Sequence, residues 1–149
     1  MNMKDSQAKT GQGGVPWADD QHCLVCGKEN PIGLKLDFVV DGDVLRTTWV
    51  ADKRFQGYEN VLHGGMIALI LDETMVNLPW KKHGVPVISA ELTTRFLKPA
   101  RIGDTLHFSS ELEDLSKRVI VTRGRCVNAA GELVAEASAK CVRIKNPNL

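Results

Sequence analysis

The sequence predicts an α+β fold, in which an antiparallel sheet of about six strands is wrapped around one long central helix. A single stretch, at about residues 64–78, has a helical pattern, and residues 66–71 within it are apolar on every side. The segments around it alternate apolar and polar residues with the period of two that is typical of strands. Short turns join most of these segments, which favours antiparallel pairing and hence this fold class.

Two strands are expected before the helix and four after it. The sequence Asp41-Gly42-Asp43 indicates a hairpin turn between the first two strands. Pro79 is expected to end the helix or to lie just past its end. In the fifth strand we expect Val119 and Val121 on the face opposite to Arg123 and Arg125. The expected strands cover residues 34–38, 44–50, 85–97, 105–115, 118–128 and 133–144.

The length and charge of the chain limit its class. A chain of 149 residues is typical of one domain, and we expect a flexible arm at residues 1–20 followed by a folded domain at residues 21–149. Lys and Arg number 19 against 18 Asp and Glu, so the net charge of +1 gives no general attraction for nucleic acid or a membrane surface. The longest apolar run is too short to span a bilayer, and the first residues lack the apolar stretch of a signal peptide. We therefore expect a cytoplasmic protein.

Four cysteines are present, and in a cytoplasmic chain we expect them to be reduced. Cys23 and Cys26 have the spacing of a zinc knuckle, but zinc requires four ligands and no second pair of this kind occurs. His22, Cys126 and Cys141 are the other candidate ligands. We expect the pair to pack the N-terminal segment in a turn, with neither a metal nor a cofactor.

One stretch holds the residues most able to carry chemistry. Asp72 and Glu73 follow six apolar residues in the expected helix, and buried carboxylates are kept mainly where they are paired, hydrogen-bonded or used. They point about 100° apart, so only one of them faces a given cleft. Gly64 and Gly65 open the helix, where free N–H groups can hold an oxyanion or a polarised carbonyl. His63 is about two helical turns from Asp72, so a site that uses both is expected to be shared between subunits.

These residues resemble the pattern of hotdog-fold acyl-CoA thioesterases, most closely the phenylacetate-pathway (PaaI-type) branch. The resemblance extends over about residues 23–144. It implies the hotdog fold and hydrolysis of an acyl-CoA thioester to free acid and coenzyme A, by a homodimer or a homotetramer. The similar segments are His63-Gly64-Gly65, Leu71-Asp72-Glu73, residues 90–104 and residues 23–34.

The resemblance also implies roles for single residues. Asp72 of one subunit acts as general base on water or as nucleophile. The Gly64 and Gly65 amides of the other subunit polarise the thioester carbonyl. His63 orients the thioester or Gly64, and Ser89 helps to hold the water.

Further residues are expected to bind the substrate. Several relatives have an Asn six residues before the His, where this chain has Gly57. Basic side chains near the mouth of the site suit the phosphates of coenzyme A. Glu73 is the second candidate for the base. The expected substrate-binding residues are Asn60, Glu73, Arg95, Lys98 and Arg101.

Two alternatives remain open from the sequence. One is a hotdog-type hydroxyacyl-thioester dehydratase or hydratase, which also uses a His and a carboxylate on the helix. The other is a module that binds acyl-CoA without turning it over, because a fold does not fix a function.

Overall fold

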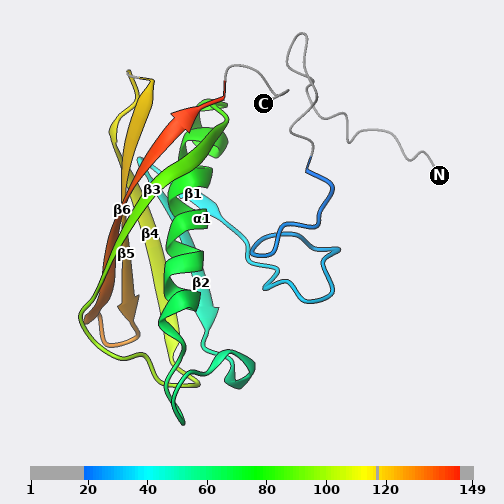
Figure 1. Cartoon of the computed structure of the whole chain (residues 1–149), viewed down its shortest axis with the longest axis vertical. Helices are drawn as coiled ribbons and strands as arrows, with labels where there is room; N and C mark the ends of the chain where they lie inside the picture. The colour runs from blue at the N-terminus through cyan, green and yellow to red at the C-terminus, as the bar shows by residue number, and fades with distance from the viewer. Residues whose placement is uncertain (1–18, 117, 145–149) are drawn as a thin grey trace, which may run out of the picture.

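The computed structural model describes residues 19–116 and 118–144 and shows a long helix packed on an antiparallel sheet (Figure 1). This arrangement confirms the predicted fold class. The expected arm at residues 1–20 lies almost wholly outside the described residues and stays a prediction. The sheet has six strands in the order β1-β2-β4-β5-β6-β3. Its strands are β1 (Val39–Asp41), β2 (Val44–Val50), β3 (Val87–Phe96), β4 (Thr105–Asp114), β5 (Val119–Asn128) and β6 (Leu133–Arg143).

The helix, α1 (Gly64–His83), lies close against the centre of the sheet. A Cβ atom at Gly124 of β5 would come within 3.1 Å of Leu71 and 3.2 Å of Met75, so a glycine permits this approach. The buried Ser110 hydroxyl of β4 donates a 2.8 Å hydrogen bond to the Thr74 carbonyl. Within the described residues no helix has the length and the apolar character needed to cross a bilayer. The buried face of α1 consists of Ile67, Ile70, Leu71, Thr74, Met75, Leu78 and Pro79.

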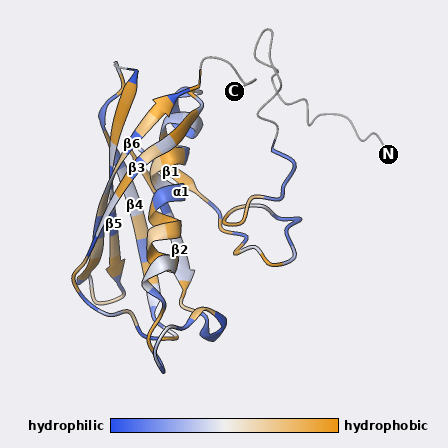
Figure 2. Cartoon of the chain, viewed as in Figure 1, coloured by the Kyte–Doolittle hydropathy of each residue, from blue (hydrophilic) through white to orange (hydrophobic). Residues whose placement is uncertain are grey.

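The other side of α1 is only partly covered in a single chain. We expected burial on every side, but Ala68 and Leu69 are half-buried, as are Asp72 and Glu73. Figure 2 shows a hydrophilic band about halfway along the helix, where the sequence has these two carboxylates. The chain from residue 19 to β1 runs on the side of α1 away from the sheet (Figure 1). The sheet therefore covers one face of the helix, and two flanks remain for other contacts.

Three expected details are wrong. The helix continues through Pro79 to His83 and ends at Gly84, whose left-handed φ of 67° suits a glycine cap. Residues 34–38 form no strand, because Leu34 and Leu36 donate backbone hydrogen bonds to the loop at residues 24–25 instead. In β5 the valines share the exposed face with the arginines, since residues an even number apart lie on one side of a strand.

The edge strand β3 is unusually exposed. Among the described residues it pairs only with β6, so its other edge is free there. A register shift between Ser89 and Glu91 turns the strand, and after it the side chains of even-numbered residues face α1. Leu92 and Phe96 point to that side with exposed fractions of 38% and 52%. An apolar, unpaired edge of this kind is a place where a second chain can add.

Candidate active site

The N-terminus of α1 is capped by its own histidine. His63 precedes the helix in an extended conformation, and its ring Nδ1 accepts a 2.8 Å hydrogen bond from the Gly65 N–H. This bond makes Nδ1 an acceptor, so the neutral ring carries its proton on Nε2. The expectation that the Gly65 amide is free does not hold in this arrangement. Within the described residues the Gly64 N–H has no acceptor.

Gly64 and Gly65 each lack room for a side chain, for a different steric reason. A Cβ atom at position 65 would lie 2.9 Å from His63 Nδ1, so any other residue would push the cap away. A Cβ atom at position 64 would lie 3.3 Å from the ring of Phe96 on β3. The helix N-terminus thus lies between the ring of His63 and the ring of Phe96. The Gly64 N–H remains without an acceptor among the described residues.

Asp72 lies on the flank of α1 near β3. Ser89 lies close enough to Asp72 for its hydroxyl to lower the pKa of the carboxyl group, and it is the cross-strand neighbour of Cys141 on β6. Asp72 Oδ1 is buried and has no hydrogen-bond partner among the described residues. A buried oxygen without a donor is unfavourable. This oxygen is therefore available to accept a hydrogen bond from a water molecule or a ligand.

Burial raises the pKa of Asp72 above its ordinary value of 3.8. The hydrogen bond from Ser89 lowers this pKa because it stabilises the ionised carboxylate, and the charge of Glu73 raises it. The net direction is upward. A carboxylate with a raised pKa is a stronger base towards water than an ordinary one.

Asp72 and the helix N-terminus share a flank of α1 but do not meet. Gly65 and Asp72 are seven residues apart, which places them on the same face about two turns from each other. A cavity of about 440 Å³ lies on the outer face of the sheet and includes only Arg95 of the expected site residues. Asp72 does not line this cavity.

Glu73 belongs to the opposite flank. Its Oε1 accepts a 2.8 Å hydrogen bond from Asn77 Nδ2, and it lies 3.2 Å from Cys23 Sγ and 3.5 Å from Cys26 Sγ. The angle of about 100° between neighbouring helical residues accounts for this separation from Asp72. Glu73 thus lies against the N-terminal segment and away from the flank near β3.

The other expected substrate-binding residues fall into two groups. Asn60 and Arg101 lie close together, because the Ile102 N–H bonds the Asn60 carbonyl and Val61 forms a bridge with Arg101. Arg101 has no acidic partner among the described residues, whereas two other cations are paired. Lys98 lies 2.8 Å from Glu132, and Arg95 lies 3.6 Å from Glu136.

Gly57 lies beside the histidine. A Cβ atom at this position would be 3.5 Å from His63 Cα, which is an ordinary contact. A side chain at position 57 would therefore lie against the helix cap, and this chain leaves that space empty.

The candidate site includes three further residues that the sequence patterns did not indicate. Phe96 packs on Gly64, Cys141 is close enough to Asp72 for its thiol to feel the carboxylate charge, and Thr122 lies beside Cys141. Burial raises the pKa of the Cys141 thiol and raises that of Cys126 to about 12, so neither is a thiolate nucleophile at neutral pH. Phe96 lies in the long strand expected at residues 85–97, but the face to which its side chain points depends on the register shift in β3.

Comparison with known families identifies one match. The family model described as the thioesterase superfamily matches residues 59–135. This range includes the helix cap, α1 and the strands β3 to β5. None of the curated proteins matches the chain.

Solved structures share the fold. A Streptococcus mutans protein bound to acetyl-CoA superposes with a TM-score of 0.67 at 20% identity, over 73% of this chain and 88% of that one. The PaaI protein of Escherichia coli gives 0.68 at 22% identity, over 74% and 84%. A phenylacetic acid degradation-related protein of Ralstonia eutropha JMP134, called a thioesterase, gives 0.66 at 28%, over 73% and 85%. The hotdog fold expected from the sequence is confirmed.

The Asp72→Asn variant should be more stable than the wild type at neutral pH. The pKa of Asp72 is higher in the folded chain than in the unfolded chain, so the native state loses stability as the pH rises through the folded value. Asn keeps the shape without the buried charge, and we expect a rise in Tm of about 3 °C at pH 7. The difference should vanish below pH 3.8, where the carboxyl is protonated in both states.

Thermal unfolding of both proteins from acid to neutral pH checks this expectation. Asp104→Asn is a poor control, because Asp104 accepts a hydrogen bond from the Arg101 N–H. Glu59→Asn, at an exposed position before the cap, is the suitable one. A lower Tm for Asp72→Asn at pH 7 would contradict the unfavourable burial of this carboxylate.

Proposed function

Because the chain belongs to the thioesterase superfamily, we propose that it hydrolyses an acyl-CoA thioester to the free acid and coenzyme A. The observation that carries this proposal is Asp72, a half-buried carboxylate with a raised pKa and one buried oxygen that has no donor within the described chain. Such a group can accept a proton from a water molecule that it holds. The acetyl-CoA bound to the structurally similar S. mutans protein supports this substrate class.

In the proposed reaction Asp72 acts as general base, with direct nucleophilic attack as the alternative. Asp72 takes a proton from water as the water oxygen attacks the thioester carbonyl carbon. Ser89 helps to hold that water beside the carboxylate. The tetrahedral oxyanion then collapses, the C–S bond breaks, and the proton passes from Asp72 to the departing sulfur.

The carbonyl oxygen is held at the helix N-terminus. The free Gly64 N–H and the Nε2–H of His63 are the two donors that support this role, since the Gly65 N–H already bonds His63 Nδ1. Donors aimed at a developing oxyanion stabilise the transition state more than the substrate. The glycine pair then serves to keep this cap compact.

We propose that the site is completed by a second copy of the chain. His63 and Asp72 of one chain lie about 13 Å apart along the helix axis, too far to act on one thioester bond. The free edge of β3 offers unpaired backbone groups and exposed apolar side chains. Antiparallel pairing of two β3 strands would place the helices of the two chains side by side in opposite directions.

The contacts along β3 indicate the register of this pairing. Ser89 marks the position of Asp72 on the strand, and Phe96 marks the position of Gly64. If the two-fold axis passes through Thr93, and residue 90 bulges out of the pairing in both strands, Ser89 of one chain lies opposite Phe96 of its partner. The base of one chain then meets the helix N-terminus of the other.

Arg101 is the basic residue best placed to bind a phosphate of coenzyme A. It is exposed, it lies in the turn beside the helix cap, and it has no acidic partner among the described residues. Lys98 and Arg95 are weaker candidates because each already has a carboxylate partner.

All four cysteines are free, which supports the expected cytoplasmic location.

Release of free thiol from a panel of acyl-CoA thioesters tests the proposed function. We expect turnover by the wild type and a loss of about 10²–10⁴-fold in Asp72→Asn, because the general base is removed. The panel spans short, medium and long acyl chains and aromatic acyl groups. The Glu59→Asn variant is the control. Absence of thiol release from every thioester by folded wild type, or full activity of Asp72→Asn, would overturn the proposal.

The Ser89→Ala variant tests how the base is tuned. Loss of the hydroxyl removes the hydrogen bond that lowers the pKa of Asp72, so this pKa should rise further. The acid limb of the kcat/KM profile should then move to higher pH. The matched control is Ser138→Ala, on the outer face of the neighbouring strand β6. A shift in the opposite direction would show that Asp72 is not the group whose ionisation limits the rate.

A further inference from the structure

The flank of α1 opposite to Asp72 carries a second cluster of reactive side chains. The two thiols of Cys23 and Cys26 and the carboxylate of Glu73 offer three potential ligand atoms that all lie within 4.8 Å of one another. In the sequence Glu73 is 50 residues from Cys23 and 47 residues from Cys26, and all three residues are half-buried. We propose that this cluster binds a zinc-type, thiophilic divalent cation and so fastens the N-terminal segment to α1.

The spacing of the ligand atoms fits a tetrahedral ion. Zinc lies about 2.3 Å from thiolate sulfur and about 2.1 Å from carboxylate oxygen, so a tetrahedral site separates sulfur from oxygen by about 3.6 Å. The two sulfur-to-Glu73 Oε1 distances are 3.2 and 3.5 Å. Small side-chain adjustments would therefore admit the ion.

The backbone around the first cysteine is arranged to support a thiolate. The N–H groups of Val25 and Cys26 both approach Cys23 Sγ at 3.4 Å. Hydrogen bonds from amides to sulfur stabilise the negative charge that a metal ligand requires. The turn is tight as well, since a Cβ atom at Gly27 would lie 2.4 Å from the Gln21 carbonyl oxygen and 2.5 Å from the Cys23 nitrogen.

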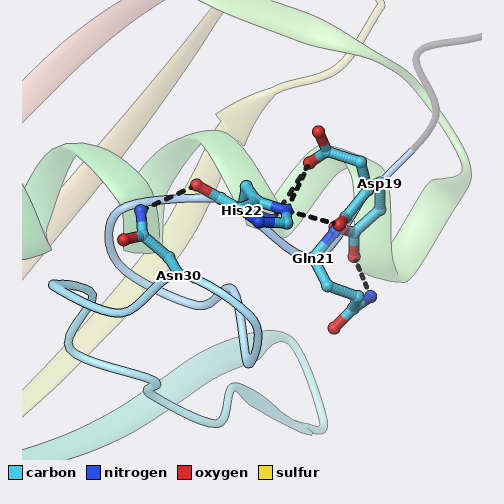
Figure 3. Close-up of polar contacts among 5 residues, drawn as sticks. Asp19, Gln21, His22 and Asn30 are labelled. Carbon is cyan, nitrogen blue, oxygen red and sulfur yellow. Dashed lines mark hydrogen bonds and ion pairs between the residues drawn. The ribbon is translucent and has the colours of Figure 1, made fainter.

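The loop that carries the cysteines is tied together before any ion binds. Asn30 Nδ2 donates a 2.9 Å hydrogen bond to the His22 carbonyl (Figure 3). The Gly27 N–H donates to the Cys23 carbonyl. The His22 ring is engaged by the Asp20 carbonyl through Nδ1 at 2.8 Å. His22 is therefore not counted among the ligands. In the proposed zinc site the protein supplies three ligands, and a water molecule takes the fourth coordination position.

The sequence alone did not identify Glu73 as a third metal ligand. The count of cysteines and histidines spoke against a zinc site, because the third ligand is a carboxylate far along the chain. Two weakly donating thiols on one carboxylate oxygen form a poor hydrogen-bonding set. A cation that replaces the two thiol protons satisfies all three groups together.

Metal binding to the full chain tests this proposal without any measurement of activity. Protein purified under reducing conditions without chelator should contain one zinc ion per chain by elemental analysis. After removal of the metal, cobalt(II) should give the thiolate charge-transfer and visible bands of tetrahedral coordination, and zinc should displace it. Zinc should also raise the Tm of the metal-free protein.

Variants locate the ion. Glu73→Gln and Cys26→Ser should each lower the affinity for zinc at least tenfold. Glu29→Gln makes the same change of charge as Glu73→Gln, in the loop that carries the cysteines, and should leave the affinity unchanged. Circular dichroism checks that each variant is folded, and Glu73→Gln keeps the test decisive if Cys26→Ser fails to fold. Absence of cobalt bands in the reduced wild type, or unchanged zinc affinity in folded Glu73→Gln, would overturn the proposal.

Discussion

The close approach of α1 to the sheet at Gly124 sets the directions in which the side chains of the helix project. Leu71 and Met75 fill the space that a side chain at this position would occupy, and the rotation of the helix about its axis is thereby fixed. With that face buried, neighbouring Asp72 and Glu73 must project on opposite flanks. One flank meets β3 and its serine, and the other meets the cysteine loop. Packing in the core thus separates the proposed catalytic carboxylate from the carboxylate of the proposed metal site, one residue apart.

The local patterns of the sequence predicted the fold and singled out the residues of the proposed site. Apolar periodicity located the helix and five of the six strands, and Asp72 with the glycine pair stood out because charge and glycine are unusual in a buried helix. The rest depended on contacts between distant segments. A register shift in β3 brings Ser89 and Phe96 to the same face, although simple alternation places them on opposite faces. The meeting of Glu73 with Cys23 likewise depends on how the N-terminal loop folds back over the helix.

The cap of α1 shows how a small geometric detail changes a chemical assignment. Two glycines at a helix N-terminus suggested two free amides, yet the His63 ring occupies one of them. The ring gains a defined tautomer from that bond, and in the proposed site its Nε2–H takes the place of the lost donor. A histidine cap and a glycine pair therefore act as one unit, which neither residue type reveals alone.

The proposed catalytic pair is split between two chains, and a mixed oligomer tests this most directly. Asp72→Asn and His63→Ala, each inactive alone, would be co-expressed with different affinity tags, and the doubly tagged species purified. In a shared site, one of the two sites of each mixed pair has both groups intact, so we expect about half the wild-type rate per pair. Mixed oligomers as inactive as both parents would show that each chain carries its own complete site, and would contradict the shared arrangement.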